Sequence, residues 1–135
     1  MGIFELNGVR VGVMICADFG FPELARAYAL SGVHVLAVSS SWAYPDDDLW
    51  EICNRARAAE NGIYVVSCDR VGPTSRGLVK VGRSMMCDPN GFVVANLAET
   101  VDTYFVGTVR AADVDARHAD MKWLEWVRPE VYARL

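Results

Sequence analysis

Apolar residues follow one another in two runs that predict buried β-strands. Residues 9–16 (VRVGVMIC) and 33–41 (VHVLAVSSS) are rich in β-branched side chains, which is typical of strands buried on both faces. Between them, residues 22–31 (PELARAYALS) predict a helix, because Pro22 suits a first helical turn and Gly32 a helix end. Strand, helix and strand within about 30 residues predict a βαβ unit with parallel strands.

A second helix and several further strands follow along the chain. The expected elements are a helix over residues 49–61, a strand over 63–68, two strands over 79–87 and 92–97, and a strand over 104–109. The run 46–48 (DDD) would cap the helix, which explains these carboxylates without a metal ion. Residues 88–91 (DPNG) form a turn signal, and Asp113 would cap a short helix. The pattern predicts one α/β (α+β) domain, with parallel units first and an antiparallel hairpin second.

Composition narrows the class of protein. The chain has 135 residues, of which 53% are hydrophobic, so it can fill a core without disulfides. A net charge of -4 argues against binding to nucleic acid or to an anionic membrane, and no apolar run approaches the ~20 residues of a membrane span. The N-terminus lacks a signal-peptide pattern, and the four cysteines are widely spaced. We therefore expect free thiols, a cytoplasmic location and no metal.

Cys16 stands where α/β folds place reactive groups. It ends the first apolar run, a few residues before the helix at Pro22. Ligand sites in open α/β sheets lie at the carboxyl ends of strands. A helix N-terminus close by favours a thiolate and lowers a thiol pKa, and the backbone N–H of Ala17 could hold an oxyanion. A cysteine in an apolar strand is also an ordinary core residue, so placement alone leaves both interpretations open.

Five motifs follow one another in order around and after Cys16. They are I-C-x-D-x-x-F-P-E at residues 15–23, R-A-A-E-N at 57–61, G-R-S at 82–84, D-P-N-G at 88–91 and R-P-E-V-Y at 128–132. The series resembles the nitrilase superfamily of carbon–nitrogen hydrolases, and the match runs from about Phe4 to Tyr132.

The resemblance implies an α-β-β-α sandwich with a Glu-Lys-Cys triad and no cofactor. In such enzymes a cysteine attacks an amide carbonyl or nitrile carbon, and water hydrolyses the thioester-type intermediate. Carried onto this sequence, Cys16 is the nucleophile and the backbone N–H of Ala17 is an oxyanion donor. The substrate would be a small amide or nitrile. Trp42 and Phe19 are candidates for the apolar lining of its pocket, and plain core positions are the alternative.

The chain departs from the family pattern in its length. The family's glutamate and lysine lie long stretches before the cysteine, whereas only 15 residues precede Cys16. Lys80 and Lys122 do not match the family's lysine segment, and Glu5 matches an ordinary position. We therefore interpret residues 1–135 as the C-terminal half of a hydrolase domain, inactive as an isolated fragment.

Other polar residues have simpler structural explanations. Asp18 would accept hydrogen bonds from turn amides, and Glu23 would complement the helix dipole. Arg57 and Glu60 would form structural polar contacts. His34 lies inside an apolar run and His118 in a charged, solvated segment.

The helix at residues 22–31 is apolar nearly all round, which indicates that two of its sides are covered. Family members dimerise through the helices after the nucleophile and through the tail. We therefore expect a homo-oligomer, with residues from about 120 to 135 docking at an interface.

Three interpretations of function remain open at this point. The first is a carbon–nitrogen hydrolase. The second is a catalytically dead remnant that serves as an assembly or binding module. The third is another cysteine hydrolase that recruits His34 or His118 as its base.

Overall fold

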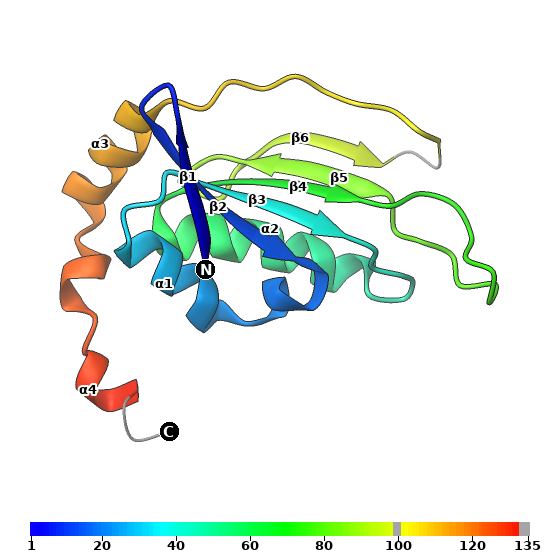
Figure 1. The fold of residues 1–135 in the computed structure, drawn as a ribbon, viewed down its shortest axis with the longest axis horizontal. Coiled ribbons are helices and arrows are strands. Elements are labelled where there is room, and N and C mark those ends of the chain that lie inside the picture. Colours follow the sequence, from blue (N-terminus) through cyan, green and yellow to red (C-terminus); the bar gives the residue numbers. More distant parts are fainter. Residues whose placement is uncertain (99–100, 133–135) are drawn as a thin grey trace.

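Six strands form one mixed sheet, and they lie in it in the order in which they occur in the chain. The computed structural model describes residues 1–98 and 101–132. The strands are β1 (Gly2–Leu6), β2 (Val9–Ile15), β3 (Val35–Ser40), β4 (Tyr64–Asp69), β5 (Arg83–Cys87) and β6 (Val93–Ala98). Figure 1 shows them side by side, from blue β1 to yellow-green β6.

The direction of the strands changes twice across the sheet. Strands β2, β3 and β4 are parallel, whereas β1 pairs with β2, β5 with β4 and β6 with β5 in antiparallel fashion. Helices α1 (Pro22–Leu30) and α2 (Asp47–Asn61) connect the parallel strands. The expected mixed α/β domain is thereby confirmed. The described residues form one mixed sheet with a helix layer on one of its faces.

Helices α1 and α2 cover one face of the sheet, and the core lies between them and the strands (Figure 1). Gly12 lets α1 approach closely, since a Cβ there would lie 2.6 Å from a ring carbon of Tyr28. The Tyr28 hydroxyl donates to the Val13 carbonyl at 2.6 Å. On α2, the fully buried Trp50 donates its indole N–H to the Arg83 carbonyl at 2.6 Å. These two polar contacts fix both helices to the sheet.

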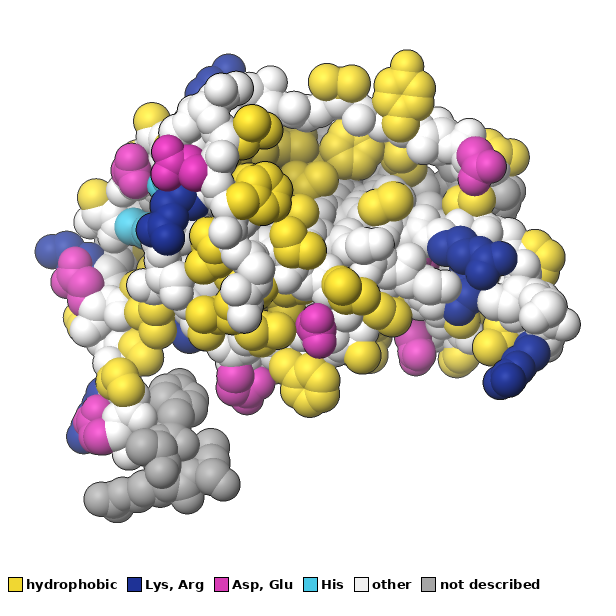
Figure 2. All heavy atoms as spheres, viewed as in Figure 1, with side chains coloured by type: hydrophobic (Ala, Val, Ile, Leu, Met, Phe, Trp, Pro, Cys, Tyr) yellow, Lys and Arg dark blue, Asp and Glu magenta, His cyan; other side chains and the backbone are white. Residues whose placement is uncertain are grey.

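The opposite face of the sheet is open. Along β2, Gly12 and Met14 face the helices, whereas Val13 and Ile15 are 38% and 64% exposed. The expectation of a strand buried on both faces is wrong here, because both covering helices lie on the same side. Figure 2 shows hydrophobic side chains gathered in the hollow of this face.

Residues 101–110 cross the open face as an extended segment, which we call the strap (Figure 1). The expected strand over residues 104–109 is wrong, because this segment joins no strand ladder. Gly107 instead packs on the Met86 sulfur of β5, where a Cβ would not fit. The strap lies over the sheet face and not beside an edge, so its backbone has no strand to pair with.

Strand β1 is an element that the sequence-based reasoning missed. It forms a hairpin with β2 through Asn7 and Gly8, whose φ values are 50° and 78°. Asn-Gly between extended runs is the strongest short-range signal for such a hairpin, because both residues tolerate a positive φ. The signal was present in the sequence.

The C-terminal segment forms α3 (Ala111–Met121), a 3₁₀ turn η2 (Trp123–Trp126) and α4 (Pro129–Tyr132). The Tyr64 hydroxyl donates to Asp113 Oδ2 at 2.5 Å and so ties α3 to the amino end of β4. Asp113 lies in the first turn of α3, and the N-cap residue is Arg110. Residues 133–135 of the expected docking tail lie outside the described residues.

The Tyr64–Asp113 hydrogen bond makes stability depend on pH in a defined direction. Burial, together with the bond to Asp113, raises the pKa of Tyr64 to about 12. The folded state therefore holds this proton more tightly than the unfolded state, in which the pKa is about 10. The contribution is complete below pH 10 and is lost as pH rises from 10 towards 12.

We predict that Tyr64→Phe lowers the free energy of unfolding by about 1.5–3 kcal/mol at pH 8, the cost of one hydrogen bond to a charged group. Between pH 10 and pH 11 the wild-type protein should lose more stability than the variant, as measured by urea denaturation. Cys87, whose burial raises its pKa to about 12, titrates in both proteins and cancels from the comparison. Identical pH slopes for the two proteins would contradict the assignment.

Candidate active site

The carboxyl ends of the three parallel strands form one edge of the sheet. The pairing register aligns Ile15 with Ser39 and Ser39 with Cys68, and one residue further it aligns Ser40 with Asp69. Cys16 follows this row directly. Because parallel strands end on the same edge, their following loops meet there, where α/β folds place ligands.

Cys16 has a backbone conformation that only a few non-glycine residues adopt. Its φ is +49°, in the left-handed region, and it begins the 3₁₀ turn η1 (Cys16–Gly20). Such a conformation costs of order 1–3 kcal/mol and persists only where the surroundings impose it. Residues of this kind are concentrated at functional sites. The conformation separates Cys16 from an ordinary strand cysteine.

Asp18 closes the start of the turn. Its Oδ2 accepts the backbone N–H of Ile15 at 3.1 Å, and its carbonyl accepts the N–H of Phe21 at 3.1 Å. The expected contact between Asp18 and a turn amide is present. Ala17 lies in the first turn of η1, where backbone N–H groups have no partner within the helix.

Phe19 and Arg57 hold the middle and the end of the turn. Phe19 is fully buried, and its ring packs edge-on against Trp50 with centroids 5.7 Å apart. Arg57 of α2, 8% exposed, donates Nη2–H to the Gly20 carbonyl at 3.2 Å and Nη1–H to Glu60 Oε1 at 3.0 Å. The expected structural role of Arg57 and Glu60 thus includes a contact with the cysteine turn.

The two aromatic candidates differ in what they expose. Trp42 is half-buried and also packs on Trp50, with centroids 5.4 Å apart, so Trp42 and Phe19 meet on the same ring. Phe19 has no exposed surface and supports the turn from within the core. Its placement lends no support to a substrate contact, whereas Trp42 retains surface for one.

Asp69 organises the loops beside the cysteine, a role that the sequence-based reasoning missed. It is 4% exposed, and its carboxylate accepts the backbone N–H groups of Trp42 at 2.7 Å and Gly82 at 3.1 Å. Lys80 donates its ammonium to the Ser41 carbonyl at 2.5 Å in the same region. A carboxylate at the end of an apolar strand was the available signal for Asp69.

Both histidines lie at the other end of the parallel strands. His34 precedes β3, and its Nδ1 accepts the Arg10 N–H at 2.9 Å. His118 is half-buried, with Nε2 2.8 Å from the carbonyl of Asn61, which precedes β4. The expectation that His118 is solvated is therefore wrong. Neither imidazole is placed beside Cys16, so the structure gives no support to a histidine base.

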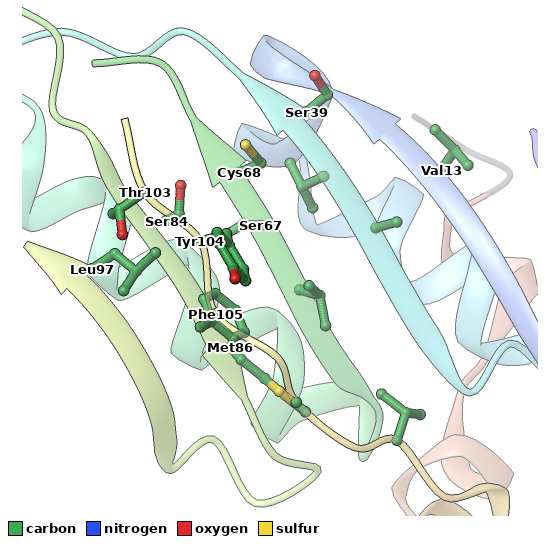
Figure 3. A pocket seen from close by; sticks show the side chains of 15 residues that line it. Val13, Ser39, Ser67, Cys68, Ser84, Met86, Leu97, Thr103, Tyr104 and Phe105 are labelled. Atoms are coloured by element: carbon green, nitrogen blue, oxygen red, sulfur yellow. The ribbon is translucent and has the colours of Figure 1, made fainter. Parts of the chain in front are cut away.

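An elongated hollow of about 450 Å³ lies on the open face, between the sheet and the strap. Ser39, Cys68 and Met86 project into it from β3, β4 and β5, and Tyr104 and Phe105 approach from the strap (Figure 3). The lining is mostly apolar. It is continuous with the carboxyl edge of the strands, because Ser39 and Cys68 belong to both.

The other cysteines differ from Cys16 in burial. Burial raises the pKa of the Cys53 thiol, although Arg57 opposes the shift, and it raises the pKa of Cys87 to about 12. Cys68 is exposed. In the part of the chain that the structure describes, no three metal-ligating side chains gather, and no helix is both long and apolar enough to span a membrane.

The model of the carbon–nitrogen hydrolase family matches residues 1–119. A "probable nitrilase" of Schizosaccharomyces pombe is 38% identical over 134 residues, which are 98% of this chain and 49% of that protein. A CN-hydrolase superfamily protein from Xanthomonas campestris has the same fold over 93% of this chain and 49% of its own, with a TM-score of 0.85 and 22% identity.

A mutant amidase from Nesterenkonia sp. AN1 matches 98% of this chain and 46% of its own, with a TM-score of 0.83 and 27% identity. It carries the acetamide moiety of fluoroacetamide on its active-site cysteine. In each comparison the chain spans about half the length of the protein that it matches.

We predict that Asp69→Ala lowers the free energy of unfolding by about 2–4 kcal/mol in urea denaturation. The substitution leaves the N–H groups of Trp42 and the buried Gly82 without their acceptor. Tryptophan fluorescence of the folded state should also shift, because the Trp42 loop loses its anchor.

Asp88→Ala is the matched control. Asp88 Oδ1 also accepts two backbone N–H groups, at 2.9 Å from Asn90 and 3.0 Å from Phe92, but in an exposed turn where water can replace the oxygen. Its loss should cost about 1 kcal/mol. Equal losses in the two variants would overturn the role assigned to Asp69.

Proposed function

Because the chain belongs to the carbon–nitrogen hydrolase family, we propose that it carries the nucleophile of an enzyme that hydrolyses small amides or nitriles. One observation supports the proposal most strongly. Cys16 combines a left-handed backbone with a position at the carboxyl edge of the parallel strands. A core cysteine would need neither feature.

For an amide the chemistry has two balanced steps. The Cys16 thiolate attacks the carbonyl carbon, the C–N bond breaks, and the nitrogen leaves as ammonia or an amine after receiving a proton. Water then attacks the resulting thioester, releasing a carboxylic acid and restoring the thiol. The N–H of Ala17 would donate to the oxyanion in both steps.

The proton for the leaving amine requires a general acid. Asp18, the nearest carboxylate along the chain, is engaged as the acceptor of the Ile15 N–H. We propose that the glutamate and the lysine of the family triad come from a preceding segment. The support is that this chain covers only 49% of the length of each of two relatives. Lys80 does not replace that lysine in this proposal, because its ammonium is engaged by the Ser41 carbonyl.

Amide-type bonds are our preferred substrate class, with Trp42 as an apolar wall of the pocket. The Nesterenkonia amidase, similar over 98% of this chain, supports that preference through the acetamide adduct on its cysteine. Nitriles remain within the proposal, because the relative from Schizosaccharomyces pombe is named a nitrilase.

A binding or assembly module without catalysis is the second candidate. The open sheet face favours it, because Val13, Ile15 and the apolar hollow offer a surface for another protein layer. In that case Cys16, which is half-buried, would react no faster than the exposed thiol of Cys68.

We further propose that two copies associate through the outer side of α1. The sequence predicts that α1 is covered on two sides, and the described residues cover one. Its other side lines a groove together with Glu60 of α2 and two C-terminal residues, Val127 and Pro129. The exposed aromatic ring of Trp126 stands beside these C-terminal residues.

We predict that chloroacetamide alkylates Cys16 roughly ten-fold or more faster than Cys68 in the same molecule, because turn N–H groups stabilise charge at Cys16. The thiolate sulfur displaces chloride and gains one carbamoylmethyl group, so peptide mass spectrometry gives both rates. Buried Cys53 and Cys87 should react only after unfolding. Cys16→Ser should abolish the fast phase and Cys68→Ser should leave it. Equal rates at Cys16 and Cys68 would favour the non-catalytic module.

For assembly, light scattering at micromolar concentration should show at least a dimer. Ala27→Glu, which places a charge in the groove beside α1, should shift the protein to monomer. Ala116→Glu, at an exposed position of α3, is the control and should not change the mass. A monomeric wild-type protein would refute this interface.

A further inference from the structure

The turn that begins at Cys16 needs restraints at both ends to keep its strained backbone. Asp18 holds the start, through the N–H of Ile15. At the other end the carbonyl of Gly20, the last residue of η1, has one side-chain partner, and this partner comes from a helix that lies far along the chain.

This partner is Arg57, 37 residues further on. The guanidinium is a planar fork, so a bond at one nitrogen fixes the direction of the other. Nη1 is held by Glu60 Oε1 at 3.0 Å, and Nη2 then points to the Gly20 carbonyl at 3.2 Å. The side chain of Arg57 is 10% exposed, so water competes little for these contacts.

The backbone of Arg57 is restrained as well. Its carbonyl accepts the side-chain amide N–H of the fully buried Asn61 at 2.9 Å. About two turns earlier on α2, Trp50 packs on Phe19 of the cysteine turn. The cysteine turn is therefore fixed to α2 by an apolar contact in its middle and by an ion-paired hydrogen bond at its end.

We propose that Arg57 is the positioning residue for the nucleophile, with Glu60 orienting it. The inference rests on the proposed function for its catalytic meaning, but its structural part stands without it. Among the described residues, the Arg57 guanidinium donates to Glu60 and to the Gly20 carbonyl, and it makes no hydrogen bond to the Cys16 sulfur. It acts by keeping η1 closed, so that the left-handed conformation of Cys16 and the direction of the Ala17 N–H are maintained.

The test compares two arginines on the same helix. Arg57→Gln removes the fork at the cysteine turn. Arg55→Gln is the matched control, because Arg55 also donates to a glycine carbonyl, that of Gly91, at 3.3 Å, in the turn between β5 and β6. Amide hydrogen exchange of the whole chain, resolved by residue with NMR, reports on both turns at once.

In Arg57→Gln, the amides of Ile15 and Phe21 should exchange about ten-fold faster, the factor for losing about 1.4 kcal/mol of local stability. The amides of β4 should be unchanged. The Cys16 Cα and Cβ chemical shifts should move away from their left-handed values. In Arg55→Gln, the Gly91 amide should exchange faster and the cysteine turn should be unaffected.

Reactivity supplies the second readout. In Arg57→Gln the ratio of Cys16 to Cys68 alkylation by chloroacetamide should fall towards one, and Arg57→Lys should restore part of it through its single ammonium. If wild-type Cys16 and Cys68 react equally, the proposed function fails while hydrogen exchange still decides the role of Arg57.

Two results would overturn the inference. One is unchanged exchange at Ile15 and Phe21 in Arg57→Gln. The other is an equal increase in the hydrogen-exchange rate of all amides, which would show a global loss of stability. If Arg57→Gln does not fold, Glu60→Gln decides, because it leaves the arginine in place but weakens its orientation. Glu60→Gln should increase the hydrogen-exchange rates of the Ile15 and Phe21 amides by a smaller factor. Unchanged exchange rates at these two amides would refute the proposal.

Discussion

The left-handed backbone at Cys16 is the constraint on which the site depends. A non-glycine residue adopts it only when neighbouring contacts leave no relaxed alternative. Here those contacts come from within the turn, from the aromatic core and from a buried arginine on α2. The aromatic contact has a further structural purpose, since Trp50 also fixes α2 to β5 through the Arg83 carbonyl. The geometry of the cysteine is therefore a property of the whole helix layer.

The regular elements were largely predictable because local signals and tertiary packing agree for them. Residues 22–31 were predicted to form a helix, and α1 spans Pro22–Leu30. The strands predicted before and after this helix are present as β2 and β3, and the second predicted helix is present as α2. The strap over residues 101–110 could not be predicted in this way. Its apolar residues satisfy a strand pattern, but the segment joins no strand: Phe105 and Val109 pack against the core, whereas Tyr104 and Val106 are exposed. Composition alone does not distinguish a segment beside an edge from one above a face.

In the candidate site, too, the features that are local in the sequence were predictable and the contacts between distant residues were not. Cys16 and Ala17 were predicted as site residues from the sequence, because the motif that contains them is contiguous in the chain. The contacts that hold it are not contiguous. Arg57 meets Gly20 across 37 positions, and Asp69 meets Trp42 across 27. Such pairings depend on the register of β2, β3 and β4, which becomes known only with the fold. His118 was misjudged for the same reason, since its partner Asn61 is 57 residues away.

The side chains of β2 alternate between the two faces of the sheet, and this alternation determines which substitutions affect the Cys16 turn. The contacts described for the Cys16 turn come from the helix side of the sheet or from the strand-end loops, whereas Val13 and Ile15 point to the opposite side. The side chains that hold the Cys16 turn are thus physically separate from those exposed on the open face. Substitutions of side chains on the open face can alter that surface without removing any of the contacts described for the Cys16 turn. The two faces of this one sheet therefore carry separate sets of contacts, and each set can change independently of the other.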